Sequence, residues 1–564
     1  MKNTLLFLFC QIFLISNAQH FDWANSYGST GADGGKAITV DQFGNIYTVG
    51  YFNGTVDFDP NSGTYYLTSN GDYDCFIQKV DSSGNFVWAK SFGGTSSEMA
   101  NSIVIDAFSM IYIKGYFRET VDFNPGINTN ELTASMFGNM FLLKLDSDGE
   151  FQWVKDLENL PLYDKVNTMA ISGTNIIITG QFSGTMDFDP NAGTTELTSN
   201  GGKDIYIQKI DILGNFVWAK NIGGIYNEEE ASAITTDNIG NIYIGGSFVQ
   251  TLDFDPNSGT NNVTAQSRDN FILKLNSFGG FEWVKTMGGT GSSTESASII
   301  LDSDNNIYNT GTFSGTSDFD PNTGTSSLTS AGSFDVFIQK LDNNGNLIWV
   351  KSFGGNKLDK SNSITLDNDN NVYTTGYFYE TVDFDTGNDD VYNLTTVDNY
   401  KNIFVHKLTK DGVFEWAVSI GEDTGNEAGN SILSFNNKIY TTGYYIGTVD
   451  FDFSEEIHTL TSKGHTDIFL LKIDPKEIII EDTTTSIFSI NTSLINIYPN
   501  PSKGIFNFDT DEVIKELIIY NNKGQIIKTS FDNNLIDVSK EIDGVYYIDI
   551  TTKNRQIVHK IMKK

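Results

Sequence analysis

Tryptophan recurs at a nearly constant interval along this chain, and that interval constrains the fold more than any other feature. The seven tryptophans in 564 residues are spaced 65, 65, 65, 65, 66 and 67 residues apart. A fixed period of this length is typical of an array of one supersecondary unit. The tryptophans are Trp23, Trp88, Trp153, Trp218, Trp283, Trp349 and Trp416.

Each repeated unit has the pattern of four short strands. In the first unit these are residues 36–41, 46–52 (IYTVGYF), 75–81 (CFIQKVD) and 86–92 (FVWAKSF), which are rich in β-branched and aromatic residues. The short turns between them predict antiparallel neighbours. The run 55–60 (TVDFDP) predicts a short extra ribbon between the second and third strands.

A four-stranded sheet with apolar residues on both faces needs cover on both sides. Seven such sheets cover one another when they form a ring. The sequence therefore predicts an all-β fold, a seven-bladed β-propeller of antiparallel four-stranded blades over residues 19–474. The alternative, an open β-solenoid, has shorter coils and would need capping repeats, which the sequence lacks.

The two ends of the repeat region predict how the ring closes. The chain begins with a lone tryptophan strand, residues 20–27 (HFDWANSY), and its last unit stops after 468–474 (IFLLKID) without a tryptophan strand. We therefore expect the N-terminal strand to complete the last blade. Opening such a ring would strip the backbone groups of a whole strand of their partners.

Five repeated motifs, SIxxD, GNIYTTGYF, TVDFDPNxGT, DxFIQKLD and GNFVWAKSFGG, resemble those of bacterial seven-bladed β-propeller repeat proteins. The resemblance covers residues 20–474. Such proteins include both binders and enzymes, so the resemblance implies a fold and leaves the activity open.

The N-terminus predicts a secretory signal peptide over residues 1–18. Lys2 precedes an apolar run over 5–15, and small residues lead to Ala18 at the expected cleavage position. The run is about half the length that spans a bilayer, and no later run is longer, so we expect no transmembrane segment in the mature chain. Cys75 would be its only cysteine, which leaves no internal disulfide.

The C-terminal part differs from the repeats. Residues 475–493 are rich in threonine and predict a linker, and residues 494–564 alternate short strands and turns as in a small β-sandwich. The motifs YPNP, SKG, IIYNNKGQ, IDVS and DGVYYIDI, with a basic end, resemble the C-terminal sorting domain of the type IX secretion system of Bacteroidetes. This resemblance implies the type IX machinery as a partner, export across the outer membrane and removal of the domain.

The formal charge of −35 lies in the repeats, because residues 494–564 are nearly neutral. An acidic main domain disfavours nucleic acid, whose phosphates need Lys and Arg. It suits cations, basic partners or solubility.

The repeated TxDFD run is a candidate metal site. In an extended segment its two carboxylates lie on one side, and an Asn and a Gly follow, which together offer the oxygen ligands that Ca²⁺ prefers. The glycine spacing and the absence of a twelfth-position Glu exclude an EF-hand. The alternative is that the aspartates cap their own turns and pair with repeated lysines. The candidate metal ligands are Asp57, Asp59, Asp187, Asp189, Asp253, Asp255, Asp318 and Asp320.

A second set of acids follows each tryptophan by ten to twelve residues, before the innermost strand. We predict a ring of seven carboxylates around one mouth of the axial channel, where like charges would raise pKa values or recruit a cation. The alternative is that each acid binds backbone NH groups of its own or the next blade. These candidate ligand-binding residues are Asp33, Glu98, Asp164, Glu230, Glu295, Asp359 and Glu427.

No GxSxG, HExxH, P-loop or Cys-His pattern occurs in the chain. The sequence therefore predicts a secreted or cell-surface, non-catalytic propeller that binds a glycan, a protein or a cation through an acidic face. Ca²⁺ is the one cofactor that it suggests. The alternative is a carbohydrate-active or other hydrolytic enzyme that uses carboxylates at the channel mouth, since glycoside hydrolysis needs two of them.

Overall fold

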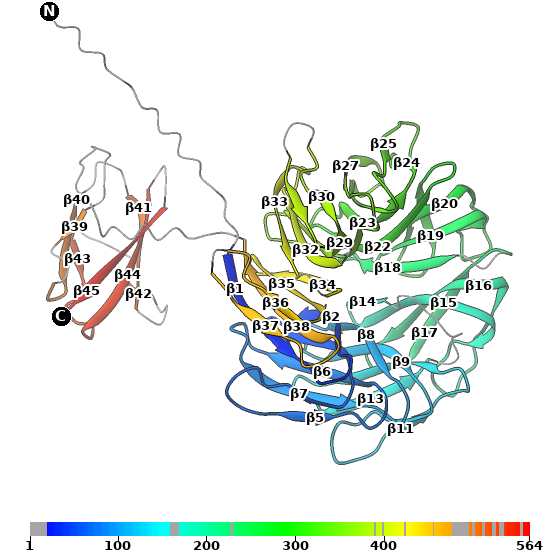
Figure 1. The fold of residues 1–564 in the computed structure, drawn as a ribbon, viewed down its shortest axis with the longest axis horizontal. Helices are drawn as coiled ribbons and strands as arrows, with labels where there is room; N and C mark the ends of the chain where they lie inside the picture. The colour runs from blue at the N-terminus through cyan, green and yellow to red at the C-terminus, as the bar shows by residue number, and fades with distance from the viewer. Residues whose placement is uncertain are drawn as a thin grey trace, which may run out of the picture. The chain divides into compact units, whose positions relative to one another are not determined.

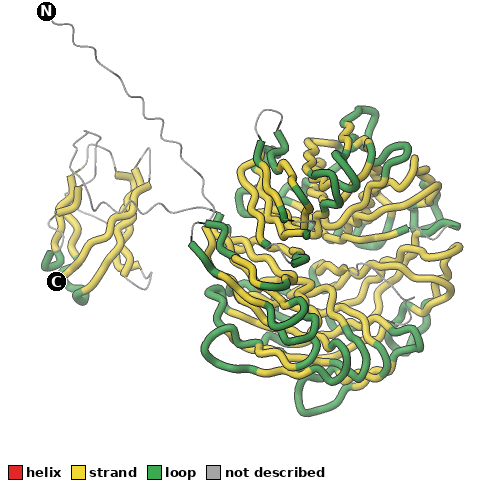
Figure 2. The backbone as a smooth tube through the Cα atoms, in the orientation of Figure 1, coloured by secondary structure: helices red, strands yellow, loops and turns green. Residues whose placement is uncertain are grey.

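The computed structural model describes residues 20–157, 168–225, 229–387, 391–397, 400–421, 425–454, 456–475, 496–498, 502–509, 514–521, 526–528, 535–552 and 556–564. The predicted signal peptide and residues 476–493 of the predicted linker lie outside these ranges. The chain divides into two compact units, Met1–Glu477 and Ile478–Lys564, which we describe separately. Strands and loops account for the described residues (Figure 2), and none of these residues belongs to a helix that is long and apolar enough to span a bilayer.

The first blade shows how one unit folds. Its four strands are antiparallel, in the order β2-β3-β6-β7, and the ribbon β4-β5 branches between the second and the third. These elements are β2 (Gly34–Val40), β3 (Ile46–Phe52), β4 (Thr55–Asp57), β5 (Tyr66–Thr68), β6 (Asp74–Val80) and β7 (Phe86–Phe92).

The next three blades repeat this order. The second blade has β8 (Met99–Ile105), β9 (Ile111–Phe117), β12 (Asn139–Leu145) and β13 (Phe151–Asp156), with the ribbon β10 (Thr120–Asp122) and β11 (Glu131–Thr133). The third has β14 (Thr168–Ser172), β15 (Asn175–Asp187), β16 (Glu196–Asp211) and β17 (Phe216–Ile222). The fourth has β18 (Glu230–Thr236), β19 (Ile242–Asp253), β20 (Asn262–Leu275) and β21 (Phe281–Met287). In the third and fourth blades the ribbon continues the two middle strands.

The last three blades have separate ribbons. The fifth has β22 (Ser293–Leu301), β23 (Ile307–Ser314), β26 (Asp335–Leu341) and β27 (Leu347–Phe353), with β24 (Thr316–Asp318) and β25 (Ser327–Thr329). The sixth has β28 (Lys360–Leu366), β29 (Val372–Tyr379), β32 (Lys401–Leu408) and β33 (Phe414–Ile420), with β30 (Thr381–Asp383) and β31 (Asn393–Thr395). The seventh has β34 (Ala428–Phe435), β35 (Lys438–Tyr445), β38 (Asp467–Asp474) and β1 (His20–Tyr27), with β36 (Thr448–Asp450) and β37 (Thr459–Thr461).

These sheets confirm the predicted propeller and its closure. The N-terminal strand β1 pairs antiparallel with β38, so the first and last strands of the ring share the seventh sheet. In Figure 1 the sheets surround a common axis, and the labelled strands β2, β8, β14, β18, β22 and β34 lie nearest to it.

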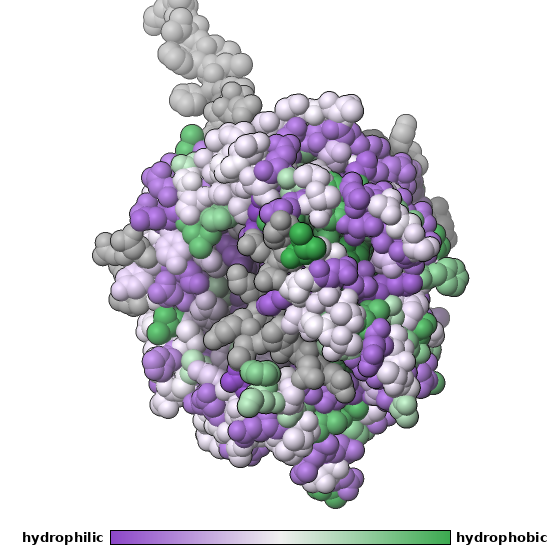
Figure 3. Space-filling view, turned by 90° about the vertical axis from the view of Figure 1, so that its right-hand side faces the viewer, coloured by the Kyte–Doolittle hydropathy of each residue, from purple (hydrophilic) through white to green (hydrophobic). Residues whose placement is uncertain are grey.

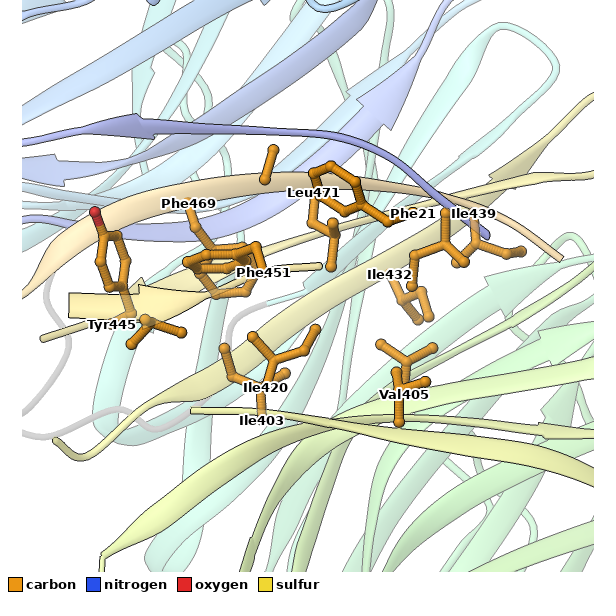
Figure 4. Close-up of a cluster of buried hydrophobic side chains, with 14 of the residues drawn as sticks. Phe21, Ile403, Val405, Ile420, Ile432, Ile439, Tyr445, Phe451, Phe469 and Leu471 are labelled. Carbon is orange, nitrogen blue, oxygen red and sulfur yellow. The ribbon is translucent and has the colours of Figure 1, made fainter. Parts of the chain in front are cut away.

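The cores of the ring lie between blades. Seven clusters of buried apolar side chains each draw on two neighbouring blades, including the pair formed by the seventh and the first. Figure 4 shows the cluster between the sixth and seventh blades, where Ile403 and Val405 face Phe451, Phe469 and Leu471. Each blade therefore buries both of its faces, as the apolar pattern requires.

The C-terminal unit consists of two sheets around one core. Phe506 and Ile536 of the first sheet pack in the same cluster as Leu517, Ile548 and Ile561 of the second, which makes a two-layer sandwich. The first sheet contains β39 (Asn496–Tyr498), β40 (Ile505–Asp509) and β43 (Leu535–Asp537). The second contains β42 (Ile526–Lys528), β41 (Ile514–Asn521), β44 (Gly544–Thr552) and β45 (Gln556–Lys563).

Candidate functional site

A β-bulge interrupts the innermost strand of six blades at the same place. In β2, Gly35 pairs with Gly50, Lys36 has no residue opposite, and pairing resumes between Ala37 and Val49. A bulge bends its strand and turns one side chain to a new direction. The bulged residues are Lys36, Asn101, Ser232, Ala297, Asn362 and Asn430.

The glycine of the repeated TTGYF-like run makes room for this bulge. A Cβ on Gly50 would lie 2.0 Å from the carbonyl oxygen of Gly34, and the equivalent distance in the sixth blade, from Gly376 to Lys360, is 1.8 Å. No side chain fits at such a distance. A glycine inside each predicted second strand was the sequence signal for the bulge, because interior strand glycines often mark bulges.

All six bulged side chains line one cavity of about 500 Å³ where the innermost strands begin. Residues two positions before the bulge also line it, and they bring charge: Glu230 and Glu295 in the fourth and fifth blades and Lys360 in the sixth. The axial cavity, as we call it, therefore has a polar lining with both signs of charge.

Hydrogen bonds between blades hold the cavity wall. Asn362 Nδ2 donates to the carbonyl oxygen of Gly429 at 2.8 Å, and Ser232 Oγ donates to that of Ser296 at 2.6 Å. Each of these bonds joins a bulge to the next blade. The wall is thus fixed before any ligand enters, which lowers the entropic cost of binding.

Acidic and basic side chains lie both beside and across from one another in the axial cavity, because Lys360 of the sixth blade adjoins Glu295 of the fifth. In a ring of seven blades the first blade lies opposite the fourth and fifth, so Lys36 faces the side that carries Glu230 and Glu295. Glu295 Oε1 lies 3.7 Å from Arg268 Nε at this end of the ring.

Two further lysines lie near Lys36. Burial, and then the positive charges of Lys360 and Lys401, lower the pKa of Lys36. Lys401 Nζ donates to the hydroxyl of Tyr444 at 2.9 Å and lies 4.1 Å from the ring centroid of Tyr377. Sequence reasoning missed this group, because its members come from three strands that only the fold brings together.

The acids predicted around the channel mouth lie at two different positions. Asp33, Glu98, Asp359 and Glu427 come directly before their innermost strands, and their side chains are buried. Glu230 and Glu295 lie one position later in the repeat, where Glu229 and Thr294 instead occupy the buried position. The predicted Asp164 lies outside the described residues. The described acids therefore do not form one ring of equivalent carboxylates.

The buried acids accept hydrogen bonds from nearby backbone groups. Asp33 accepts from the NH groups of Ser29 and Asn53, at 2.6 and 2.8 Å. Asp359 accepts from those of Gly355 and Tyr379, at 2.7 and 2.9 Å. These bonds match the alternative in which the acids hold loops of their own repeat.

Carboxyl groups also approach one another at junctions between blades. Burial, with a smaller contribution from the neighbouring charge of Asp74, raises the pKa of Glu98 to about 7. Burial likewise raises the pKa of Asp74 to about 6 and that of Asp467 to about 7. Charged forms are disfavoured at such buried positions.

The candidate calcium ligands occupy turns that they cap. Asp57 Oδ1 accepts from the NH groups of Asp59 and Tyr65, and Asp59 Oδ1 accepts from that of Asn61. Among the described residues, no three His, Cys, Asp or Glu side chains gather as a metal ion requires. Calcium binding stays a prediction. The same turn bonds are made by Asp187, Asp189, Asp253, Asp255, Asp318 and Asp320.

Comparison with known proteins identifies the tail. Residues 496–564 match the family of secretion system C-terminal sorting domains. The protein is therefore a β-propeller that carries a type IX sorting domain, exported to the cell surface or secreted, with the tail removed.

Other relatives are distant. The chain is 24% identical to an uncharacterized WD repeat-containing protein of Acanthamoeba polyphaga mimivirus, over 75% of this chain and 36% of that protein. It is 21% identical to the regulatory protein FlaEY of Caulobacter vibrioides, over 38% of this chain and 22% of that one. It thus spans about a third or less of either relative.

Solved structures with some likeness include two proteins of low sequence identity. A quinohemoprotein alcohol dehydrogenase of Pseudomonas putida HK5 is 9% identical, with a TM-score of 0.36, over 87% of this chain and 81% of that one. Sqt1 of Chaetomium thermophilum is 10% identical, with a TM-score of 0.35, over 80% and 97%.

Proposed function

We propose that this exported propeller is a non-catalytic module that binds a polar ligand, foremost a glycan, in the axial cavity. The observation that carries the proposal is the convergence of six bulged side chains on one cavity of about 500 Å³. This volume lies in the range of small-molecule sites. Its lining of Asn, Ser, Lys and Glu side chains offers hydrogen-bond donors and acceptors, which hydroxyl-rich ligands need.

The outer surface adds support. Among the coloured residues on the side shown in Figure 3, hydrophilic residues and residues of intermediate hydropathy predominate, and apolar residues lie in separate spots. Large apolar patches are the usual mark of a protein-docking surface. A polar ligand in the axial cavity therefore fits better than a hydrophobic partner on this side.

The test is a glycan array probed with the mature secreted protein and with an Ala297→Phe variant. Ala297 is the smallest bulged side chain in the cavity lining, so phenylalanine would fill space without removing a hydrogen bond. We expect saturable binding by the wild-type protein and its loss in the variant, with similar melting temperatures. The proposal would be rejected if the wild-type protein bound no glycan, or if the variant bound glycans as well as the wild type.

The hydrolase alternative has one observation in its favour. Glu230 and Glu295 line the same cavity from adjacent blades, and glycoside hydrolysis uses two carboxyl groups about 5–10 Å apart. Incubation of the bound glycans with the protein, followed by chromatography, separates the two functions. Turnover that disappears in Glu230→Gln would favour the enzyme; binding without turnover favours the module.

A further inference from the structure

We propose that the glycan in the axial cavity continues across Tyr51 into a second subsite, a pocket of about 420 Å³ between the seventh and the first blades, which takes a further neutral sugar unit. We call this second subsite the rim pocket. The inference rests on the proposed function, because it concerns the length of the same ligand.

The rim pocket lies at the same end of the ring as the axial cavity. Phe52 at the end of β3 pairs with Asp74 at the start of β6, so the segments that follow β3 and precede β6 lie at one end of the first blade. The innermost strand β2 begins at that end too, because Gly34 pairs with Tyr51. The walls of the rim pocket are residues 30–32, Asn53, residues 72–73 and His465.

The ring of Tyr51 connects the two cavities. Its centroid lies 5.4 Å from Nζ of Lys36, which lines the axial cavity, and 5.3 Å from the ring centroid of Tyr73, which lines the rim pocket. A Cβ on Gly34 would lie 2.9 Å from the Tyr51 ring, so the ring packs closely on the backbone of β2. Tyrosine combines an apolar face with a hydroxyl group. A sugar chain that leaves the axial cavity therefore meets an aromatic path to the rim pocket.

Hydrogen bonds fix the polar groups of the rim pocket. Ser97 Oγ donates to Asp72 Oδ2 at 2.8 Å, and Asn53 Nδ2 donates to the carbonyl oxygen of Asp72. The main-chain NH of Asn53 donates to Asp33 Oδ1 at 2.8 Å. A Cβ on Gly31 would lie 2.4 Å from Asn53 Oδ1, so the glycine keeps this space open. As in the axial cavity, polar groups that are already held in place lower the entropic cost of binding.

The lining of the rim pocket matches a neutral sugar unit. Tyr73 and His465 contribute flat rings with polar edges, which suit the C–H face of a pyranose. Asp72 and Asn53 contribute acceptors for its hydroxyl groups. Among the described residues, Asp72 is the one acid in this lining, and its charge disfavours an anionic unit.

The experiment is calorimetric titration of the mature protein with laminari-, cello- and manno-oligosaccharides, from the monosaccharide to the hexasaccharide. A unit in the axial cavity tethers the next units near the rim pocket, so we expect the affinity to rise with length by at least about tenfold and then to level off. Asn53→Tyr should fill the rim pocket and remove this rise. The fold accepts tyrosine there, because Tyr379 occupies the same repeat position in the sixth blade and its main-chain NH donates to Asp359 in the same way.

His465→Ala is the second variant, because His465 is exposed and its replacement removes one ring of the pocket without opening the core. It should reduce the rise of affinity with length and keep the melting temperature. Ser333→Ala is the matched control. Ser333 lies two residues before the third strand of the fifth blade, as His465 does in the seventh, and it lines neither cavity. Its titrations should equal those of the wild type.

The outcomes separate the two proposals. The rim pocket is overturned if affinity does not depend on length, or if either variant keeps the full rise while it melts like the wild type. If short and long forms bind equally and Ala297→Phe abolishes both, the proposed function stands and the rim pocket falls. If no oligosaccharide binds, both fall.

Discussion

Asn430 in the last blade donates a hydrogen bond from Nδ2 to the carbonyl oxygen of Gly35 in the first blade, at 2.7 Å and across 395 residues of sequence. The same kind of bond joins Asn362 and Ser232 to their next blades, so the junction at which the ring closes is built like two of the others. The weak point of the ring is instead the strand that the N-terminus supplies.

Loss of that strand should destabilise the whole ring. Phe21 and Tyr27 of β1 are buried, and burial of such a side chain contributes about 1.5–3 kcal/mol each. We expect Tyr27→Ala to lower the melting temperature by several degrees and deletion of residues 20–27 to lower it much further. His20→Ala, at an exposed position of the same strand, is the control. An unchanged melting curve after the deletion would contradict the closure.

The bulge predicts different outcomes at two adjacent glycines of β19. A Cβ on Gly246 would lie 2.0 Å from the carbonyl oxygen of Glu230, whereas one on Gly245 would meet first the hydroxyl of Ser296, a side-chain end that can move at the expense of its hydrogen bond to Asn309. Overpacking against backbone costs about 1–3 kcal/mol. Gly246→Ala should therefore lower the denaturant midpoint clearly, and Gly245→Ala should change it little. Equal changes of the denaturant midpoint in the two variants would show that the bulge does not require glycine at position 246.

Buried carboxyl groups should make the protein more stable at pH 5 than at pH 8. The folded pKa values of Asp74, Glu98 and Asp467, about 6, 7 and 7, exceed those of an unfolded chain, which lie near 4. The folded state then binds more protons, so this stability is present at pH 4 and is lost as the pH rises through 6 to 7. Melting temperatures across this range measure the loss.

Asp74→Asn should reduce that pH dependence. Asn139 and Asn402 occupy the same position at the start of β12 and β32, so the amide fits there. A pKa raised by two units corresponds to about 3 kcal/mol of unfolding free energy. This is the largest stabilisation that the variant can gain over the wild type at pH 8. Asp81 and Asp211 have lowered pKa values, so their contribution to stability is lost as the pH falls. This opposite effect occurs only below pH 4. A variant that melts with the wild-type pH profile would refute the assignment.

We predict that a neutral residue can replace a turn aspartate without loss of stability. Asn124 replaces Asp at this position in the second blade, and its Oδ1 accepts from Gly126 N at 2.9 Å, just as Asp189 accepts from Asn191 N. Asp189→Asn should therefore keep the melting temperature within about a degree, since the acceptor oxygen remains. Calorimetry with Ca²⁺ after chelator treatment tests the metal proposal: calcium-dependent stabilisation that the variant loses would establish a bound ion.

The repeated lysines make interactions that sequence spacing suggested and others that it did not. We expected them to pair with acids within a sheet, and Lys407 and Lys472 do so with Glu415 and Asp22, at 2.5 and 2.9 Å. Lys79 Nζ lies 4.0 Å from Asp41 Oδ2 of its own blade, but it also donates to the carbonyl oxygen of Ser147 in the next blade at 3.2 Å and lies 5.0 Å from the ring centroid of Tyr47. Lys144 reaches Ile212 of the following blade in the same way, at 2.8 Å. These contacts connect blades, and a single unit read alone does not reveal them.

The sequence by itself determined the number of units, the order of strands in each and the place of the first strand, because a regular period and an apolar pattern on both faces have few packed solutions. It also determined the export tail, through a set of local motifs. These properties depend on residues near one another in the chain.

Only the tertiary structure decided which residues line the axial cavity. Lys36 lines the cavity as the bulged residue of its strand, Glu295 and Lys360 line it from two positions before a bulge, and closure of the ring brings their strands around one axis. Glu229 is buried, whereas Glu230, one position later in the chain, lines the cavity. The charge of a site built from many strands follows from register and ring geometry, and residue spacing along the chain does not encode it.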